Sequence, residues 1–215
     1  MTSIKQLRFT ISSEVFEEQD FYLATRDLSR AAQYSLLSRM LARGDLVKVS
    51  RGLYVFDEFF RRRPLSKFLI ANKLSAPSYV SFESALSHHG LIPETVLATT
   101  SAYLTRVSKF FDTPFGNFTY HYVPAKSFLL DIESRTTAAG PELIASPLKA
   151  LFDLVCVRRK HYADLHELVD DLRIDSVELL RQAQNYKILD LEELALSYKK
   201  KTCLALFTAL KRNLR

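Results

Sequence analysis

The stretch from Leu36 to Phe56, LLSRMLARGDLVKVSRGLYVF, places the strongest constraint on the fold. Apolar residues recur at helical spacing and predict an amphipathic helix over 31–43, and Gly44 supplies the left-handed residue with which many helices end. Two short segments rich in β-branched and aromatic residues follow, at 46–49 and 53–56, with a glycine-containing turn between them. The stretch therefore predicts a helix followed by a β-hairpin.

The residues before this helix suggest a second helix close to it. We expect an opening helix over 3–16, a strand edge at 21–23, and a short helix that begins at Thr25 as its N-cap and covers 26–28. Two helices with a tight connection, followed by a hairpin, have the order of a winged helix-turn-helix. In that arrangement one helix enters the major groove of DNA and the hairpin contacts the backbone. An α+β domain that binds no nucleic acid can have the same order, so both interpretations stay open here.

Positive charge is concentrated on this part of the chain. The whole chain has a net charge of +6, and residues 25–63 carry nine Lys and Arg against four Asp and Glu, a net +5. A local basic patch is typical of phosphate binding, although an ordinary solvated surface can have the same composition. We interpret the arginines of the linker 57–63 as a solvated hinge rather than as a DNA contact.

The expected DNA contacts lie on the outward face of the predicted helix and on the hairpin. Gln33 would pair with adenine and Arg39 with guanine, whereas the serines and the hairpin cations would contact phosphates. The expected DNA-binding residues are Arg26, Arg30, Gln33, Tyr34, Ser35, Ser38, Arg39, Arg43, Lys48 and Arg51.

The remainder of the chain predicts a mixed α and β domain. The expected elements are helices starting at Pro64, Ser81 and Pro147, a strand over 95–105, a hairpin of 109–112 and 118–123, a loop over 136–141, a strand at 143–145, and helices starting at Asp175 and Asp190, the last running to the C-terminus. The fold class is therefore α+β, with a winged-helix domain over 1–60 and an α+β domain over 61–215.

Nothing in the sequence indicates catalysis or a cofactor. The five histidines have no ligand spacing, and Asp131 with Glu133 is the one carboxylate pair that suits a divalent ion. Lys149 and Asp153 lie four residues apart, which favours an ion pair at the boundary of a helix over a contact site for the C-terminal domain. We expect no metal, no cofactor and no catalytic residue.

Cysteine use and hydropathy indicate the compartment. Cys156 and Cys203 lie in apolar segments and are expected to be buried free thiols, which favours a reducing cytoplasm. No apolar run has the length of about 20 residues that crosses a bilayer, and the first residues lack the apolar core of a signal peptide.

Three separated blocks resemble the AbiEi-type antitoxins of type IV toxin–antitoxin systems. They are SRMLARGDLVKVSRGLYVF at Ser38–Phe56, YVSFESALSHHGLIPE at Tyr79–Glu94 and IASPLKALFDLV at Ile144–Val155. The resemblance implies an N-terminal DNA-binding domain that represses its own operon and a C-terminal domain that neutralises a nucleotidyltransferase-like toxin. Leu148 stands where the family usually has Glu, which puts any role of that Glu in doubt for this chain.

Two other functions remain open at this point. The chain could be a protein-binding antidote that sequesters a toxin and ignores DNA, or, with less support, a metal-dependent nuclease that uses Asp131. If it binds operator DNA, a dimer would suit repeated half-sites, because such sites are commonly read by two copies of one chain.

Overall fold

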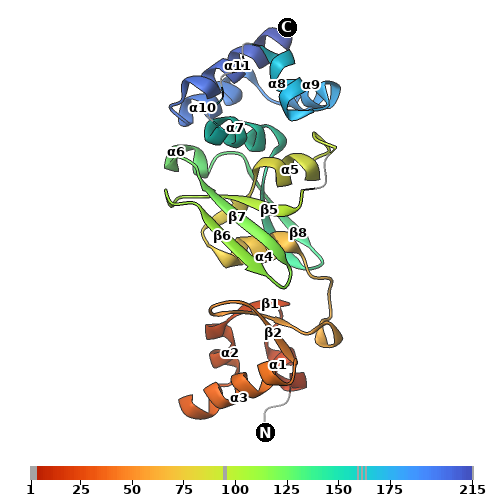
Figure 1. The fold of residues 1–215 in the computed structure, drawn as a ribbon, viewed down its shortest axis with the longest axis vertical. Helices are drawn as coiled ribbons and strands as arrows, with labels where there is room; N and C mark the ends of the chain where they lie inside the picture. The colour runs from red at the N-terminus through yellow and green to blue at the C-terminus, as the bar shows by residue number, and fades with distance from the viewer. Residues whose placement is uncertain (1–3, 94–95, 159, 161, 163, 215) are drawn as a thin grey trace.

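The computed structural model describes residues 4–93, 96–158, 160, 162 and 164–214. Within these residues the chain is an α+β protein with helices α1–α11 and two sheets. The elements form a stack, with three helices at the N-terminal end, two sheets in the middle and a group of helices at the C-terminal end (Figure 1). No described helix is both long enough and apolar enough to span a membrane.

The N-terminal part consists of three helices and a small antiparallel sheet with strand order β1-β3-β2. Gly44 and Gly52 have φ angles of 74° and 76°, so each supplies the positive φ that the end of a helix or a tight turn requires. The elements are α1 (Ile4–Thr10), β1 (Val15–Glu17), α2 (Glu18–Ala24), α3 (Arg30–Ala42), β2 (Leu46–Ser50) and β3 (Leu53–Phe56).

The helix–glycine–hairpin order of α3, β2 and β3 is confirmed, but the expectations for the residues before it are wrong. The opening helix ends at Thr10 rather than residue 16, because Val15 pairs with Val55 as part of β1. The segment 21–23 lies inside α2 rather than in a strand. Thr25 follows α2 instead of starting a helix, and its hydroxyl donates to the carbonyl of Phe21 at 2.8 Å.

The small sheet is buried on both faces. Leu53 and Val55 on β3 belong to the large hydrophobic core that continues into the rest of the chain. Tyr54 and Phe56 alternate with them and belong to a smaller core under α1, α2 and α3. Side chains alternate between the two faces of a strand, so β3 contributes to both cores at once. The N-terminal helices are therefore joined to the larger part of the molecule by continuous packing.

The second sheet is mixed and has the strand order β6-β7-β5-β4-β9-β8. Helix α4 packs on the side that faces β1, while α5 and α7 pack together on the other side (Figure 1). The elements are η1 (Glu58–Phe60), α4 (Lys67–Leu74), β4 (Ser78–Val80), α5 (Phe82–His88), β5 (Ala98–Tyr103), β6 (Lys109–Thr113), β7 (Gly116–Tyr122), α6 (Ala125–Phe128), β8 (Ile132–Thr137), β9 (Gly140–Ala145), α7 (Pro147–Arg158), α8 (Leu165–Leu172), α9 (Ser176–Gln184), α10 (Ile188–Ser197) and α11 (Lys201–Asn213).

In the second part of the chain, the residue at which a helix begins is set by its capping residue. Pro147 is the first residue of α7, and Asp175 caps α9 by accepting hydrogen bonds from two backbone amides, as the sequence predicts. The sequence predicts a helix that starts at Pro64, but α4 begins at Lys67, because the Ser66 hydroxyl accepts hydrogen bonds from the amides of its first turn. Asp190 was expected to start one long helix, whereas it lies in the first turn of α10.

Two further expectations differ from the structure. The predicted loop over 136–141 is the tight end of a hairpin, because β8 and β9 remain paired up to Thr137 and Gly140. The expected last helix is two helices, α10 and α11, and Lys199 between them has a positive φ of 52°. The expected hairpin of β6 and β7 is confirmed, as is a strand within 95–105, although Thr95 itself lies outside the described residues.

A buried polar cluster connects the second sheet to the C-terminal helices. The ammonium of Lys149 lies 2.9 Å from a carboxylate oxygen of Asp153, and both side chains are fully buried on α7. Asp153 also accepts from the hydroxyls of Tyr79 at 2.9 Å, Ser81 at 2.7 Å and Tyr198 at 2.6 Å. Burial and then the charge of Asp153 raise the pKa of both tyrosines well above the usual value, so their hydroxyls remain donors. The expected ion pair exists, but it lies in the core and not at a helix boundary.

Removing the carboxylate of this cluster is expected to destabilise the fold strongly. Asp153→Ala leaves Lys149 buried without its counter-ion, which should lower the free energy of unfolding by about 3–5 kcal/mol. Urea denaturation followed by circular dichroism measures the change. The matched control is Glu178→Ala, which removes a pair with Arg181 on the surface of α9 and should change the stability much less. Equal losses in the two variants would contradict this account of the cluster.

Candidate nucleic-acid interface

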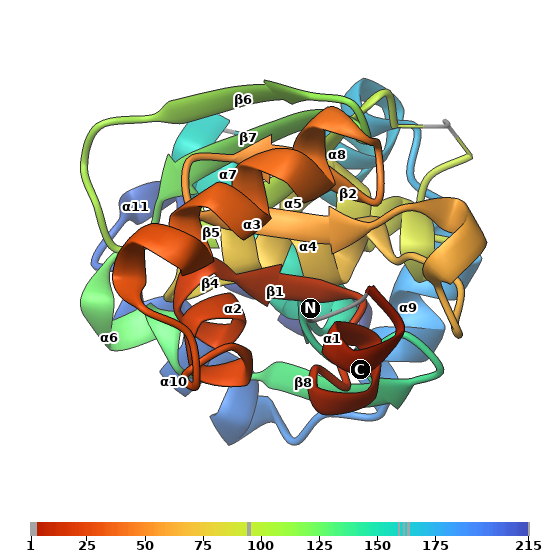
Figure 2. The same ribbon diagram turned by 90° about the horizontal axis from the view of Figure 1, so that it is seen from below.

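Helix α3 has one face in the core and one face at the surface. Leu36, Leu37 and Met40 are buried in the smaller core, and their spacing of three and four residues defines the inner side of the helix. The Ser29 hydroxyl caps the helix by accepting from the amide of Ala32 at 3.3 Å. Viewed from the N-terminal end, α3 lies in front of the other described elements and none crosses it (Figure 2). The outer face of α3 is therefore open along its length.

Six of the expected contact residues lie between Gln33 and Arg43, and five of them are on this outer face. Its exposed residues include Tyr34, Ser35, Ser38, Arg39 and Arg43. The Arg39 Nε donates to the carbonyl of Ser35 at 3.2 Å, which orients the side chain along the helix. Arg43 forms an ion pair with Asp45 at 2.7 Å, so its charge is partly compensated before any ligand arrives.

The sixth residue, Gln33, does not face outward, and its expected contact with adenine is wrong. Gln33 is 5% exposed, and its amide nitrogen donates to the carbonyls of Tyr22 at 2.9 Å and Thr25 at 2.8 Å. It therefore satisfies the carbonyls at the end of α2 and fixes the angle between α2 and α3. Helical spacing places Gln33 one turn before Leu37 on the inner face, and this signal was available in the sequence.

Two further expected cations lie just before α3 and at its first residue. Arg26 and Arg30 are both exposed, and the guanidinium carbon of Arg30 lies 3.4 Å from the centre of the Tyr22 ring. The Tyr22 hydroxyl in turn donates to Glu18 at 3.0 Å. Burial and then this hydrogen bond raise the pKa of Tyr22, so the ring stays neutral. The stacking orients Arg30 while leaving it accessible.

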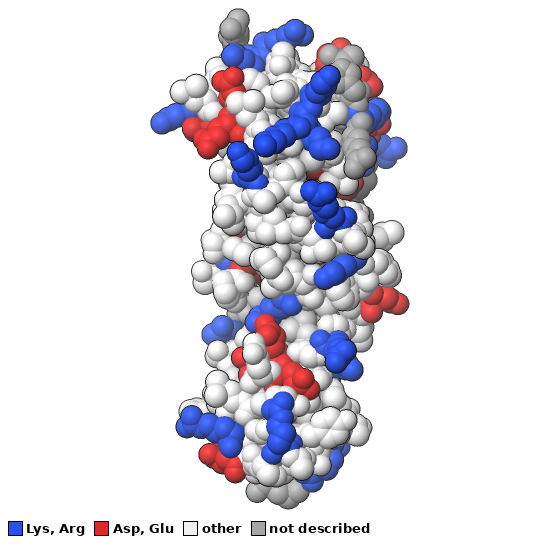
Figure 3. All heavy atoms as spheres, turned by 90° about the vertical axis from the view of Figure 1, so that its left-hand side faces the viewer, with Lys and Arg blue, Asp and Glu red and all other residues white. Residues whose placement is uncertain are grey.

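The hairpin presents Lys48 and Arg51 at the surface, as expected. Its turn is held in place because the carbonyl of Gly52 accepts a hydrogen bond from the amide of Glu18 at 2.8 Å. Basic side chains and a group of acidic ones lie close together near the N-terminal end of the molecule (Figure 3). On this face the N-terminal end therefore has a mixed pattern of charge, which constrains how a polyanion can lie against it.

A buried ion pair that the sequence did not predict fixes the linker after the hairpin. Arg8 and Glu14 are both almost fully buried and form an ion pair with each other. Glu14 also accepts from the backbone amide of Arg62 at 3.3 Å, so the segment 57–63 is attached to the N-terminal helices. Burial lowers the pKa of Arg8, and the carboxylate of Glu14 opposes this effect. The sequence gives no signal for this pair, because Arg8 and Glu14 are six residues apart, and side chains at that spacing do not share a helix face.

The other candidate residues have structural partners. Asp131 accepts from the Tyr186 hydroxyl at 2.7 Å and from Ser146, at the turn that leads into β8. In the described part of the chain, no group of three or more His, Cys, Asp or Glu residues is placed to hold a metal ion. Cys156 and Cys203 are buried free thiols, as expected.

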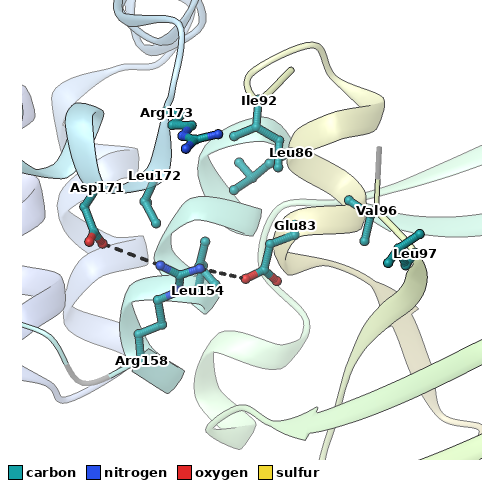
Figure 4. Close-up of a pocket in the computed structure, with 10 residues that line it drawn as sticks. All are labelled: Glu83, Leu86, Ile92, Val96, Leu97, Leu154, Arg158, Asp171, Leu172 and Arg173. Atoms are coloured by element: carbon teal, nitrogen blue, oxygen red, sulfur yellow. Dashed lines mark hydrogen bonds and ion pairs between the residues drawn. The ribbon is translucent and has the colours of Figure 1, made fainter. Parts of the chain in front are cut away.

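A cavity of about 400 Å³ lies at the other end of the second sheet, between α5, α7 and α8 (Figure 4). Its walls include Leu86 and Leu154, and Arg158 projects into it. Arg158 is paired with Glu83 at 3.1 Å and with Asp171 at 3.5 Å, so its charge is compensated within the protein. The cavity contributes no residue to the α3 surface.

No family model matches this chain, and no similar protein was found among curated sequences.

Replacing Gln33 is expected to change stability rather than to remove only a surface contact. Gln33→Ala leaves the carbonyls of Tyr22 and Thr25 without their donor, which should lower the free energy of unfolding by about 1–3 kcal/mol. Ser38→Ala on the exposed face of the same helix is the control and should stay within about 0.5 kcal/mol of the parent. Thermal unfolding checks both values, and an unchanged melting temperature for Gln33→Ala would contradict the assigned role.

Proposed function

We propose that the N-terminal part of the chain is a winged helix-turn-helix that binds double-stranded DNA and represses its own operon. The observation that carries the proposal is the open outer face of α3, with Arg39 on it and Lys48 and Arg51 on the adjoining hairpin. A helix of this width fits the major groove, and a cationic hairpin suits the neighbouring phosphates. Here α2 and α3 are the two helices and β2–β3 is the wing.

Rigid attachment supports this function. A DNA-reading helix must be held in a fixed orientation, because each base contact depends on its register in the groove. Helix α3 is fixed to α2 by Gln33 and to the small sheet by its buried leucines. The wing is fixed to α2 by the bond from Glu18 to Gly52. Helix and wing are therefore presented together as one surface.

We further propose that the protein is an antitoxin of the AbiEi type, with a nucleotidyltransferase-like toxin as its functional partner. The support is the resemblance of the three blocks, and the second and third of these also pack together through bonds from Tyr79 and Ser81 to Asp153. Leu148 is fully buried, so a glutamate at this position would lie in the core of this chain. Restored growth when the chain is co-expressed with the product of the neighbouring gene tests this part of the proposal.

The DNA-binding proposal is tested with a duplex from the region upstream of the chain's own gene. Arg39→Ala should reduce discrimination at one base pair by about 1–3 kcal/mol, because arginine reads guanine through two hydrogen bonds. Arg51→Ala should weaken binding to all sequences and reduce the slope of log affinity against log salt by about 1. Fluorescence anisotropy over a range of salt concentrations measures both effects.

The matched control is Lys187→Ala, which removes an exposed cation at the start of α10, far from α3. It should bind DNA as the parent does. Unchanged binding in both arginine variants would overturn the residue assignment. A parent protein that binds no duplex would overturn the DNA-binding function and favour a protein-binding antidote.

A further inference from the structure

The C-terminal end of the molecule has an exposed apolar surface made by α10 and the end of α6. Leu189 and Leu196 on α10 are 74% and 55% exposed, and Leu129, which follows α6, is 79% exposed. Monomeric proteins rarely expose large contiguous apolar patches, so Leu189 and Leu196, which line one depression together, suggest a contact surface. The surface is also hollowed: two adjoining depressions of about 560 and 290 Å³ share Leu130 and Glu193 as lining residues.

The leucines of α10 have the spacing of a helix-pairing surface. Leu189 and Leu196 are seven residues apart, so they lie on one side of α10, two turns from each other. Glu192 and Glu193 lie between them in the sequence and line the same depression. Alternating apolar and charged side chains at this spacing are typical of helices that pair along an apolar seam with charges beside it.

The charged residues beside Leu189 and Leu196 indicate the charge that a partner should carry. The two depressions are lined by Asp131, Asp190, Glu192 and Glu193, against Lys126 and Lys199. Neither Glu192 nor Glu193 forms an ion pair with any other residue that the structure describes. The surface is thus locally acidic on a chain whose net charge is +6. On the face drawn in Figure 3, acidic side chains gather near the C-terminal end, with Lys and Arg side chains around them.

We propose that this surface, which we call the α10 face (Leu130, Leu189, Glu192, Glu193 and Leu196), binds a basic amphipathic helix of a partner protein. The leucines would pack against an apolar stripe on that helix, and the glutamates would pair with lysines or arginines on either side of the stripe. A second copy of this chain is the less suitable occupant, because two α10 faces would bring like charges together.

The α10 face is separate from the proposed DNA-binding surface. It lies at the opposite end of the molecule from α3, with both sheets between them (Figure 1). One molecule can therefore occupy both surfaces, and failure of either proposal leaves the other intact. DNA binding by variants of the α10 face also serves as a check that these variants are folded, alongside their circular dichroism spectra.

The experiment uses a synthetic helical peptide as the probe, with leucines at positions i, i+3 and i+7 and lysines on both sides of that stripe. Binding to the full chain is measured by fluorescence anisotropy of the labelled peptide. Leu189→Ser together with Leu196→Ser should weaken binding at least tenfold, because central apolar contacts dominate such interfaces. Glu192→Lys with Glu193→Lys should weaken it similarly at low salt, and added salt should reduce the difference.

Two control peptides separate the contributions. One replaces every lysine with glutamate, and the other keeps the composition but scrambles the order, so that the leucines no longer form a stripe. Both should bind the parent at least tenfold more weakly than the probe. The matched protein control is Val177→Ser on α9, which changes an exposed apolar residue (76% exposed) outside the α10 face and should leave probe binding unchanged.

Three outcomes would overturn the proposal. The first is the absence of measurable binding of the basic peptide to the parent, and the second is equal binding of the basic and acidic peptides, which would indicate nonspecific apolar adhesion. The third is dimer formation by the parent protein in sedimentation equilibrium, together with loss of the dimer in Leu189→Ser. The α10 face would then be an interface between two copies of this chain.

Discussion

The burial of the β1–β3–β2 sheet on both faces is the constraint on which the proposed function depends. On β3, Leu53 and Val55 pack into the large core, while Tyr54 and Phe56 pack under the N-terminal helices. A strand with two buried faces cannot shift by one residue without exchanging the environments of all its side chains. The register of this sheet therefore fixes where the hairpin turn lies, and the smaller core fixes α3 beside it.

A second constraint acts at the other end of the stack. The carboxylate of Asp153 on α7 accepts hydrogen bonds from the hydroxyls of Tyr79 and Ser81, at β4 and the start of α5, and of Tyr198 after α10. One buried anion therefore connects three separate parts of the chain: α7, the β4–α5 segment and the end of α10. Such clusters contribute little net stability compared with apolar packing, but they tolerate few alternative arrangements because every partner must be satisfied. The position of α10, and with it the exposed leucine surface, follows from this cluster and from the packing of α11.

The sequence correctly predicts those helix ends and turns that depend on a residue at the end itself, such as a glycine, a proline or a capping aspartate. Gly44, Gly52, Pro147 and Asp175 all act as the sequence indicates, since positive φ and capping depend on near neighbours. The elements that were missed depend on distant partners: β1 exists because Val15 pairs with Val55 across the chain. For the candidate site, nine of the ten expected residues are exposed. Gln33 is the exception: its polarity suggests an outward side chain, but its helical position, one turn before Leu37, places it in the core.

The central claim is that the outer face of α3 and the hairpin turn form the DNA-contacting surface. Amide hydrogen exchange of the full chain, with and without the upstream duplex, tests this claim most directly because it reports every segment in one experiment. The account predicts slower exchange on DNA binding within residues 29–43 and 48–52, with no change in α10 and α11. Protection confined to the lysines at 199–201, or protection that leaves α3 unchanged, would contradict it.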